Sequence, residues 1–194
     1  MPVPLPDFKY RTFKTSWNDA LGPAFALGAG ASAPTVEVFM APTRLLTFDP
    51  TKEDNLDFSI QLPHDLELDV STVSLHPHVH WTAIASPAAN ATIVWQLCYT
   101  FAKPGTAVAT ATTFYNVQTL TSTVNTMTGA EYRKHLLTDL GNFDMPVSFF
   151  APSTMIVGNI RVSSLSTVAA STIGMLSIDF HYQSGPRGTD TEYV

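Results

Sequence analysis

The amino-acid sequence predicts an all-β protein, an antiparallel β-sandwich of jelly-roll type with an extended N-terminal arm. Three observations favour this fold class. Apolar and polar residues alternate over several segments of about eight residues, as in strands with one buried face. Turn-forming sequences such as Asp49-Pro50 and Ser86-Pro87 separate these segments. The chain shows no convincing long helix and no strand–helix–strand spacing, which argues against a parallel sheet.

Residues 1–34 are expected to form the arm. They hold five prolines and the run Gly28-Ala29-Gly30-Ala31-Ser32-Ala33, and both features disfavour regular packed structure. The segment is also rich in aromatic residues, which disordered tails seldom contain. We therefore expect an arm that docks on its own domain or on a neighbour. Its candidate partner-binding residues are Phe8, Tyr10, Phe13 and Trp17.

The predicted sandwich spans residues 35–183, and residues 184–194 form a polar C-terminal tail. The alternation is clearest at 55–62, 92–101 and 175–182. The faces predicted to be buried hold Leu56, Phe58, Ile60 and Leu62; Ile93, Trp95, Leu97, Tyr99 and Phe101; and Leu176, Ile178, Phe180 and Tyr182. In the last segment, Asp179 and His181 share the opposite face. Further strands are expected at 36–40, 75–84, 112–119, 147–150 and 155–163.

The segment 128–141 is compatible with two structures. Thr128 and Glu131 have the spacing of a helix capping box, and Gly141 could close a short helix. Residues 133–140 also alternate between apolar and polar, which slightly favours a strand.

Three histidines alternate along the segment 75–84. On a strand, Leu75, Pro77, Val79, Trp81 and Ala83 would face the core, and His76, His78 and His80 would face away from it. Because proline has no N–H, Pro77 predicts that this part lies at a sheet edge or near a strand start.

The histidine row is a candidate metal site. Imidazole nitrogens bind transition metals such as Zn, Ni or Fe, and a homotrimer could place pairs of His76, His78 and His80 around its three-fold axis. There are two alternatives to a metal site. The histidines could line a subunit interface or form hydrogen bonds to neighbouring strands, or they could form a contact that responds to pH. No acidic residue or cysteine lies within the row itself.

The absence of known catalytic motifs argues against an enzyme. A metal-dependent cupin would place an acidic residue within a few positions of its His-x-His pair, and Trp81-Thr82-Ala83-Ile84-Ala85-Ser86 contains none. The sequence also lacks a Gly-x-Ser-x-Gly elbow, a phosphate-binding loop and a His-Glu-x-x-His motif. We therefore predict a protein without catalytic residues, with a cupin-like enzyme as the remaining enzymatic alternative.

Composition limits the classes of partner. Charged residues make up 13% of the chain, well below the 25% or so of typical soluble domains, which suits surfaces that neighbouring subunits cover. The net charge of −6 and the scattered basic residues argue against nucleic-acid binding. No apolar run reaches the roughly 20 residues that span a bilayer, and the single cysteine permits no internal disulfide. We expect a soluble protein made in the cytoplasm, with no membrane partner.

Several segments resemble a group of structural proteins from tailed-bacteriophage virions. The similarity spans roughly residues 55–194. It is carried by Phe58-Ser59-Ile60-Gln61-Leu62-Pro63-His64, His76-Pro77-His78-Val79-His80-Trp81, Val94-Trp95-Gln96-Leu97-Cys98-Tyr99-Thr100, His135-Leu136-Leu137-Thr138-Asp139-Leu140-Gly141, Leu176-Ser177-Ile178-Asp179-Phe180-His181-Tyr182 and Glu192-Tyr193-Val194. The resemblance implies a β-sandwich virion component made in the host cytoplasm, and no catalytic residues.

Within that group we expect a capsid decoration, or cement, protein. It would form a homo-oligomer, with a trimer favoured, and bind the phage major capsid protein through its arm. A tail or neck component of the same fold, such as a fibre-base or adaptor protein, is the alternative.

Overall fold

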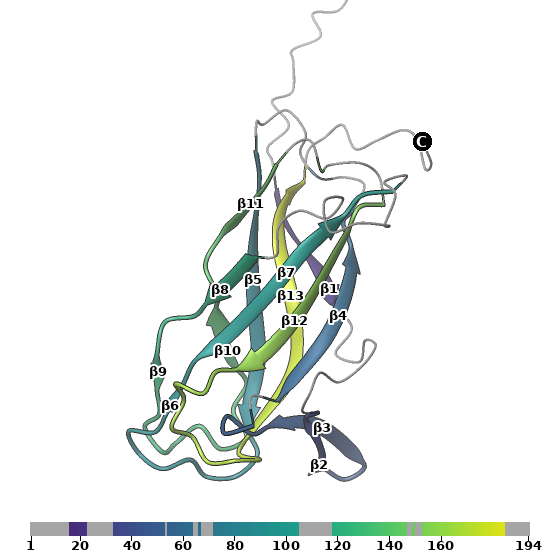
Figure 1. Cartoon of the computed structure of the whole chain (residues 1–194). Helices are drawn as coiled ribbons and strands as arrows, with labels where there is room; N and C mark the ends of the chain where they lie inside the picture. Colours follow the sequence, from purple (N-terminus) through teal and green to yellow (C-terminus); the bar gives the residue numbers. More distant parts are fainter. Residues whose placement is uncertain are drawn as a thin grey trace, which may run out of the picture.

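The computed structural model describes residues 16–22, 33–52, 54–63, 66, 72–104, 118–146, 149 and 153–184. This part of the chain contains no α-helix and forms antiparallel sheets that pack against each other, so the predicted all-β sandwich is confirmed (Figure 1). No helix in these ranges is long and apolar enough to cross a bilayer. The finer jelly-roll topology stays a prediction. The arm residues Phe8, Tyr10 and Phe13 lie outside the described residues.

Sheet A is built around two long central strands, β5 (Thr72–Ala83) and β13 (Ile173–Ser184), which pair with each other. The outer side of β5 pairs with two short strands in succession, β11 (Phe143–Pro146) and β10 (Leu136–Asp139). The outer side of β13 pairs likewise with β3 (Thr43–Phe48) and then β1 (Ser16–Gly22). β2 (Thr35–Met40) extends the sheet beyond β3. Each central strand therefore pairs on both sides over most of its length, with a short gap where one outer strand ends and the next begins.

Sheet B lies across the sandwich from sheet A and has the strand order β4-β12-β7-β8. Its strands are β4 (Asn55–Gln61), β12 (Met155–Val162), β7 (Trp95–Ala102) and β8 (Gln118–Thr121), all antiparallel. A small third sheet joins β6 (Thr92–Ile93) to β9 (Asn125–Thr126).

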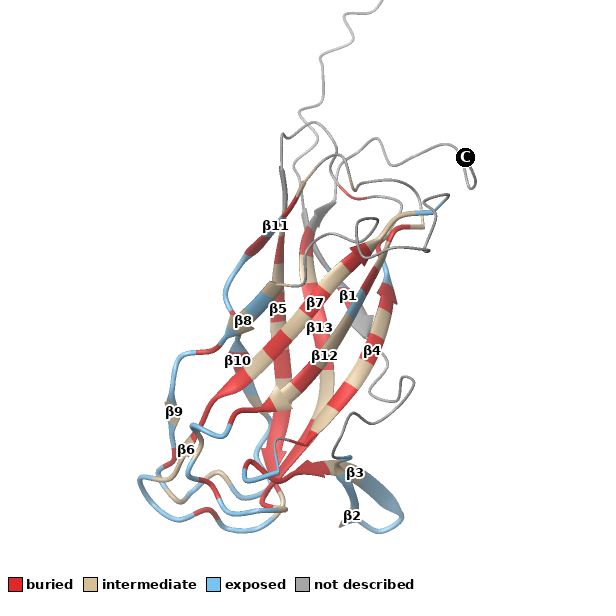
Figure 2. Cartoon of the chain, viewed as in Figure 1, coloured by how far each residue is buried: buried red, intermediate tan, exposed pale blue. Residues whose placement is uncertain are grey.

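The core lies between the two large sheets, where their inward faces meet. Buried and half-buried residues alternate along β4 and β7, as the sequence predicted for 55–62 and 92–101 (Figure 2). Aromatic rings connect the layers: Phe58 of sheet B packs on Phe180 of sheet A, with ring centroids 5.8 Å apart. Phe48 meets Trp95 edge to face at 5.4 Å. The inward side of β5, including Leu75, Val79, Trp81 and Ala83, is buried as predicted.

The boundary predicted at residue 34 is wrong for residues 16–22. These residues form β1, which joins sheet A by pairing with β13 over its full length, from Ser16 opposite Ser184 to Gly22 opposite Ile178. Trp17, expected in the arm, therefore lies on a strand of the domain, opposite Gln183. The sandwich begins before residue 35 because the C-terminal strand has a free edge that an N-terminal segment completes.

The expectation that Pro77 marks a sheet edge or strand start is also wrong. Pro77 lies inside β5, opposite Phe180 of β13. Its carbonyl accepts a hydrogen bond from the Leu140 N–H at 3.0 Å, and Leu140 follows the last residue of β10. Because the N and C=O of one strand residue point to the same side, the missing N–H of Pro77 falls where β10 has ended and β11 has not begun. A central strand thus accommodates a proline at the gap between two partners.

One residue of the face predicted for 175–182 was misplaced. The register between β13 and β5 shifts between Met175 and Ser177, which marks a β-bulge at Leu176. Met175 is buried in place of Leu176, which is half-buried, whereas Ile178, Phe180 and Tyr182 are buried as predicted.

The segment 128–141 contains one short strand and no helix. Residues 136–139 make up β10, in agreement with the favoured alternative. The capping-box residues still bond to each other: the Glu131 carboxylate accepts hydrogen bonds from the Thr128 N–H at 2.7 Å and the Gly129 N–H at 2.9 Å. The same local bonds therefore close a loop here. Of the expected strands at 112–119 and 147–150, residues 112–117, 147, 148 and 150 lie outside the described residues.

Candidate metal centre

The outer face of sheet A carries two polar rows that lie side by side on β5 and β13. In the observed register, His76 lies opposite His181, His78 opposite Asp179, and His80 opposite Ser177. Residues directly opposite each other in an antiparallel pair present their side chains to the same face. The pairing of the central strands therefore brings the histidine row of β5 against an acidic and a histidine side chain of β13.

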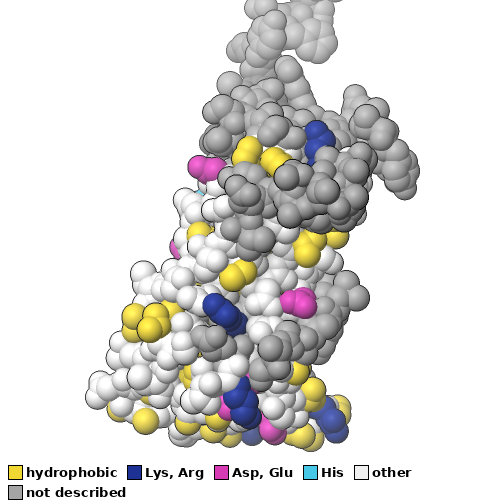
Figure 3. Space-filling view, in the orientation of Figure 1, with side chains coloured by type: hydrophobic (Ala, Val, Ile, Leu, Met, Phe, Trp, Pro, Cys, Tyr) yellow, Lys and Arg dark blue, Asp and Glu magenta, His cyan; other side chains and the backbone are white. Residues whose placement is uncertain are grey.

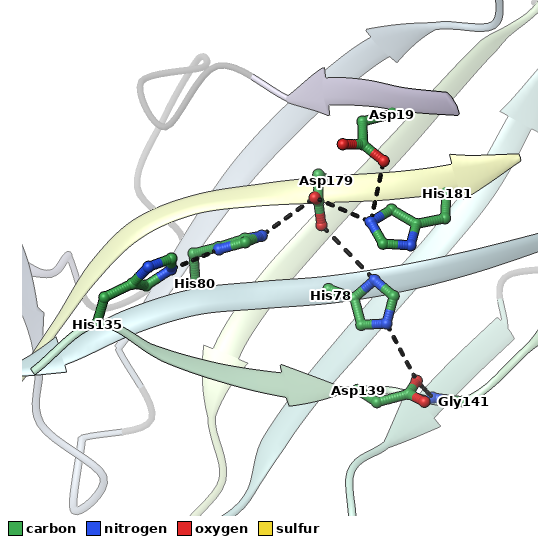
Figure 4. Close-up of polar contacts among 8 residues, drawn as sticks. All are labelled: Asp19, His78, His80, His135, Asp139, Gly141, Asp179 and His181. Atoms are coloured by element: carbon green, nitrogen blue, oxygen red, sulfur yellow. Dashed lines mark hydrogen bonds and ion pairs between the residues drawn. The ribbon is translucent and has the colours of Figure 1, made fainter. Parts of the chain in front are cut away.

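Asp179 is the centre of the resulting group. Its Oδ2 lies 3.1 Å from His80 Nε2 and 3.5 Å from His181 Nε2, and its Oδ1 lies 3.8 Å from His78 Nδ1. Figure 4 shows the three imidazole rings directed at this one carboxylate. The outward-facing row predicted from sequence is thus organised around an acidic residue about one hundred positions further along the chain.

Neighbouring strands add three outer residues. His135, just before β10, places Nε2 2.7 Å from His80 Nδ1. Asp139 at the end of β10 lies 4.0 Å from His78 Nε2 and accepts a hydrogen bond from the Gly141 N–H. Asp19 of β1 lies 3.0 Å from His181 Nε2. We call the seven residues the histidine cluster: Asp19, His78, His80, His135, Asp139, Asp179 and His181.

Hydrogen bonding assigns the tautomer of His80. A carboxylate only accepts hydrogen bonds, so His80 Nε2 must donate to Asp179. In a neutral His80 ring, Nδ1 is then an acceptor, and His135 Nε2 donates to it. The series of hydrogen bonds from His135 to His80 to Asp179 therefore holds Oδ2 of the carboxylate in place.

The other oxygen of Asp179 lacks such a partner. The side chain is only 4% exposed, although it lies on the face away from the core, and His78 is 12% exposed. Asp179 Oδ1 and His78 Nδ1 are both buried and neither has a hydrogen-bond partner. A buried polar atom without a partner costs about 1–3 kcal/mol, so the pair calls for a ligand or a bridging group.

The surroundings of His78 favour its neutral form. Burial lowers the pKa of His78 most strongly, and the nearby His181 lowers it further, while Asp139 and Asp179 act in the opposite direction. A neutral imidazole is the form that can offer a lone pair to a metal ion.

Three residues have the composition of a metal-binding set. The ligand atoms of His78, Asp179 and His181 lie within 4.8 Å of one another. Two of these were missed as ligands in the sequence, where the candidates were His76, His78 and His80. Only His78 belongs to both sets; His80 instead bonds to Asp179, and His76 is not in the group found among the described residues. The alternation at 175–182 was the available signal, because it placed Asp179 and His181 on one face.

The sequence disfavours a cupin-like enzyme because no acidic residue lies near the histidine row along the chain. That premise is wrong in three dimensions, since Asp179 supplies a carboxylate from another strand. The cluster nevertheless lies on a sheet face. A surface cavity of about 360 Å³ is lined by residues of sheet B, among them Asp57, Cys98 and Asn159, and not by the histidine cluster.

The fold and the site define a β-sandwich protein with a histidine–aspartate centre on the outer face of one sheet. No protein-family model matches the chain, and no curated protein matches it.

Proposed function

We propose that the chain is a structural protein of a tailed-bacteriophage virion, and more narrowly a capsid decoration or cement protein. It binds the major capsid protein and stabilises the head, it carries no catalytic residues, and it is made in the host cytoplasm. The resemblance over residues 55–194 supports the virion class, and the β-sandwich agrees with that resemblance.

The observation that carries the docking role is the hairpin of β2 and β3 at one end of sheet A. Its outer strand β2 exposes Val36, Val38 and Met40, with 55%, 60% and 51% of each residue accessible. β2 is also the last strand in the sheet order, so one edge of its backbone pairs with no other described strand. An apolar surface on an open strand edge favours association with another protein, because the edge can pair and the side chains can be buried.

The surface charge supports a role within an assembly. On the face shown in Figure 3, few charged side chains interrupt the neutral atoms of the middle part, and several lie together at its lower end. Low charge of this kind suits a surface that neighbouring subunits cover, and we propose a homotrimer as the assembled form. Light scattering of the purified protein tests this directly: a trimer has about three times the mass of the 21.1 kDa chain.

Binding to capsids that lack the protein tests the docking role. A variant with Val36, Val38 and Met40 all changed to serine should lose at least about tenfold in capsid occupancy, because it removes the apolar anchors. The matched control changes Val124 and Leu165, which are 61% and 70% exposed elsewhere, to serine and should bind normally. Equal occupancy of the two variants would contradict docking through β2.

Copy number separates the head from the tail or neck. Hundreds of copies in each particle support a decoration protein. About a dozen copies or fewer support a fibre-base or adaptor protein, because rings in the tail and neck contain few subunits. A particle reconstruction would locate the density.

A deletion shorter than the predicted arm of residues 1–34 tests the role of the arm. Removing residues 1–15 eliminates Phe8, Tyr10 and Phe13 while keeping β1, whose loss would uncover an edge of β13. Unchanged capsid binding by this variant would remove the arm from the proposal.

A further inference from the structure

Three side chains from the two central strands, those of His78, Asp179 and His181, place potential ligand atoms within 4.8 Å of one another. His78 Nδ1 and Asp179 Oδ1 are 3.8 Å apart, and His181 Nε2 is 3.5 Å from Asp179 Oδ2. Figure 4 shows the rings of His78 and His181 next to each other on one side of the Asp179 carboxylate, and their centroids are 4.2 Å apart. All three ligand atoms belong to one chain.

The separation of these atoms suits an ion better than a hydrogen bond. A distance of 3.8 Å is too long for a hydrogen bond between nitrogen and oxygen. Two ligands of one zinc ion, each bound at about 2.0–2.2 Å, lie about 3–4 Å apart. The spacing of His78 and Asp179 therefore matches two ligands with an ion between them.

The two unpartnered atoms are independent support. Asp179 is 97% buried, and its Oδ1 has no hydrogen-bond partner, nor has the Nδ1 of His78. Buried polar atoms in folded proteins nearly always have a partner, which can be an ion. These two atoms belong to the same small group and are directed at each other.

The chemistry of the ligands selects the class of ion. Imidazole nitrogen and carboxylate oxygen are ligands of Zn²⁺ and of related divalent transition metals. Ca²⁺ and Mg²⁺ prefer oxygen ligands alone, so two imidazoles disfavour them.

The surrounding residues have the arrangement of an outer ligand shell. His78 directs Nδ1 at Asp179 and Nε2 at Asp139, so an acidic residue lies on the nitrogen that would not bind the ion. His80 donates to Asp179 Oδ2 and is itself positioned by His135. Asp19 lies 3.0 Å from His181 Nε2, and this exposed carboxylate is the candidate fourth ligand.

We propose that His78, Asp179 and His181 bind one Zn²⁺ ion, or a chemically similar divalent transition metal, in each chain. The ion links β5 to β13, and through Asp19 it also reaches β1. His80 and Asp139 are positioning residues for this site. The proposal does not depend on a role in the virion, and it needs no symmetry axis.

Metal titration of the full chain tests the proposal. Protein treated with EDTA and dialysed is titrated with ZnCl₂ alone in a calorimeter, and bound zinc is counted by elemental analysis. The expected result is one zinc per chain and a higher melting temperature on binding, because an ion that binds only the folded chain stabilises it. One zinc per three chains, or no binding up to millimolar zinc, would overturn the site.

Variants identify the ligands. Asp179→Asn and His181→Gln should each weaken zinc binding by more than about 100-fold, the upper range for loss of an outer-shell residue. His80→Gln should weaken it by about 10- to 100-fold. Asp144→Asn, an exposed acid on β11, is the matched control and should bind as the unchanged chain does. Circular dichroism verifies that each variant is folded; should Asp179→Asn not fold, His181→Gln on the more exposed ligand carries the test.

One further variant separates this site from a site made by the histidine row alone. His76→Gln should leave the affinity and the ratio of one zinc per chain unchanged. If His76→Gln abolishes binding while His181→Gln does not, the row His76, His78 and His80 is the site and the proposal fails.

Discussion

Asp179 and Phe180 are neighbours in the chain, yet β13 presents them to opposite sides of sheet A. Both are almost completely buried, with 3% and 0% of each residue exposed. Phe180 is buried by apolar rings from sheet B and from β11, whereas Asp179 is buried by histidines of its own sheet. Burial on the core face thus rests on packing, while burial on the outer face rests on polar contacts that can be exchanged for a ligand.

The largest effect is expected on the core face. Phe180→Ala removes a ring that contacts Phe58 at 5.8 Å and Phe143 at 6.1 Å between centroids. The cavity should lower the free energy of unfolding by about 3–5 kcal/mol, as measured by urea denaturation. Leu165→Ala, at a residue 70% exposed, is the control and should change stability by less than about 0.5 kcal/mol. A loss below about 1 kcal/mol for Phe180→Ala would mean that the two sheets do not depend on this contact.

The next effect concerns the turn that supports the outer face. Gly141 has φ of +85°, and a Cβ built there meets no atom within 4 Å. Gly141→Ala should therefore cost only the backbone strain of a left-handed residue, about 1–2 kcal/mol in thermal or urea unfolding. Gly141→Asn should cost less, because asparagine tolerates this conformation. Equal losses for the two variants would show that strain is not the cause.

A smaller effect is expected for the carboxylate itself in the metal-free chain. Asp179→Asn removes a buried charge but keeps an oxygen that can accept from His80, and its amide can donate to His78 Nδ1. The free energy of unfolding, measured with EDTA present, should change by about 1 kcal/mol or less, because loss of the desolvation cost offsets the lost contacts. A loss as large as that of Phe180→Ala would contradict the distinction between the two faces.

The smallest effect is expected at an exposed carboxylate, that of Glu131, which lies in a surface loop and not in the histidine cluster. Hydrogen bonds from Thr128 lower the pKa of Glu131 from 4.5 to about 2. Since the folded pKa is below the unfolded one, these bonds stabilise the loop above about pH 4.5 and are lost as the pH falls toward about 2. In an NMR titration, the Thr128 amide should shift with a midpoint near pH 2. A midpoint near 4.5 would exclude the bonds, and Glu131→Gln should show no such titration.

The sequence predicted which face of each strand is buried better than it predicted which strands meet. Alternation alone placed Phe58, Trp95 and Phe180 in the core and the histidine row outside it, because side-chain direction has a period of two. It failed at Leu176, where a bulge shifts the period by one residue.

The candidate site could be predicted only in part. His78 was found because it lies in a visible row, and Asp179 and His181 were placed together on another strand. Their meeting depends on β5 pairing with β13 in one register, and that pairing joins segments far apart in the chain. Local patterns contain no information on such a register, so the acidic residue seemed to be missing when it lay on the neighbouring strand.

Pro77 limits how the strands of sheet A can slip past each other. Moving β10 by two residues along β5 would keep every side chain on its own face, so hydrophobic burial alone would not prevent it. A slip in the direction that brings Thr138 opposite Pro77 would move the missing N–H from Leu140, which lies beyond the end of β10, to a residue inside that strand. The proline therefore favours the alignment in which Asp139 lies opposite His78. A residue that weakens hydrogen bonding within a strand can thus favour one strand register over others that bury the same side chains.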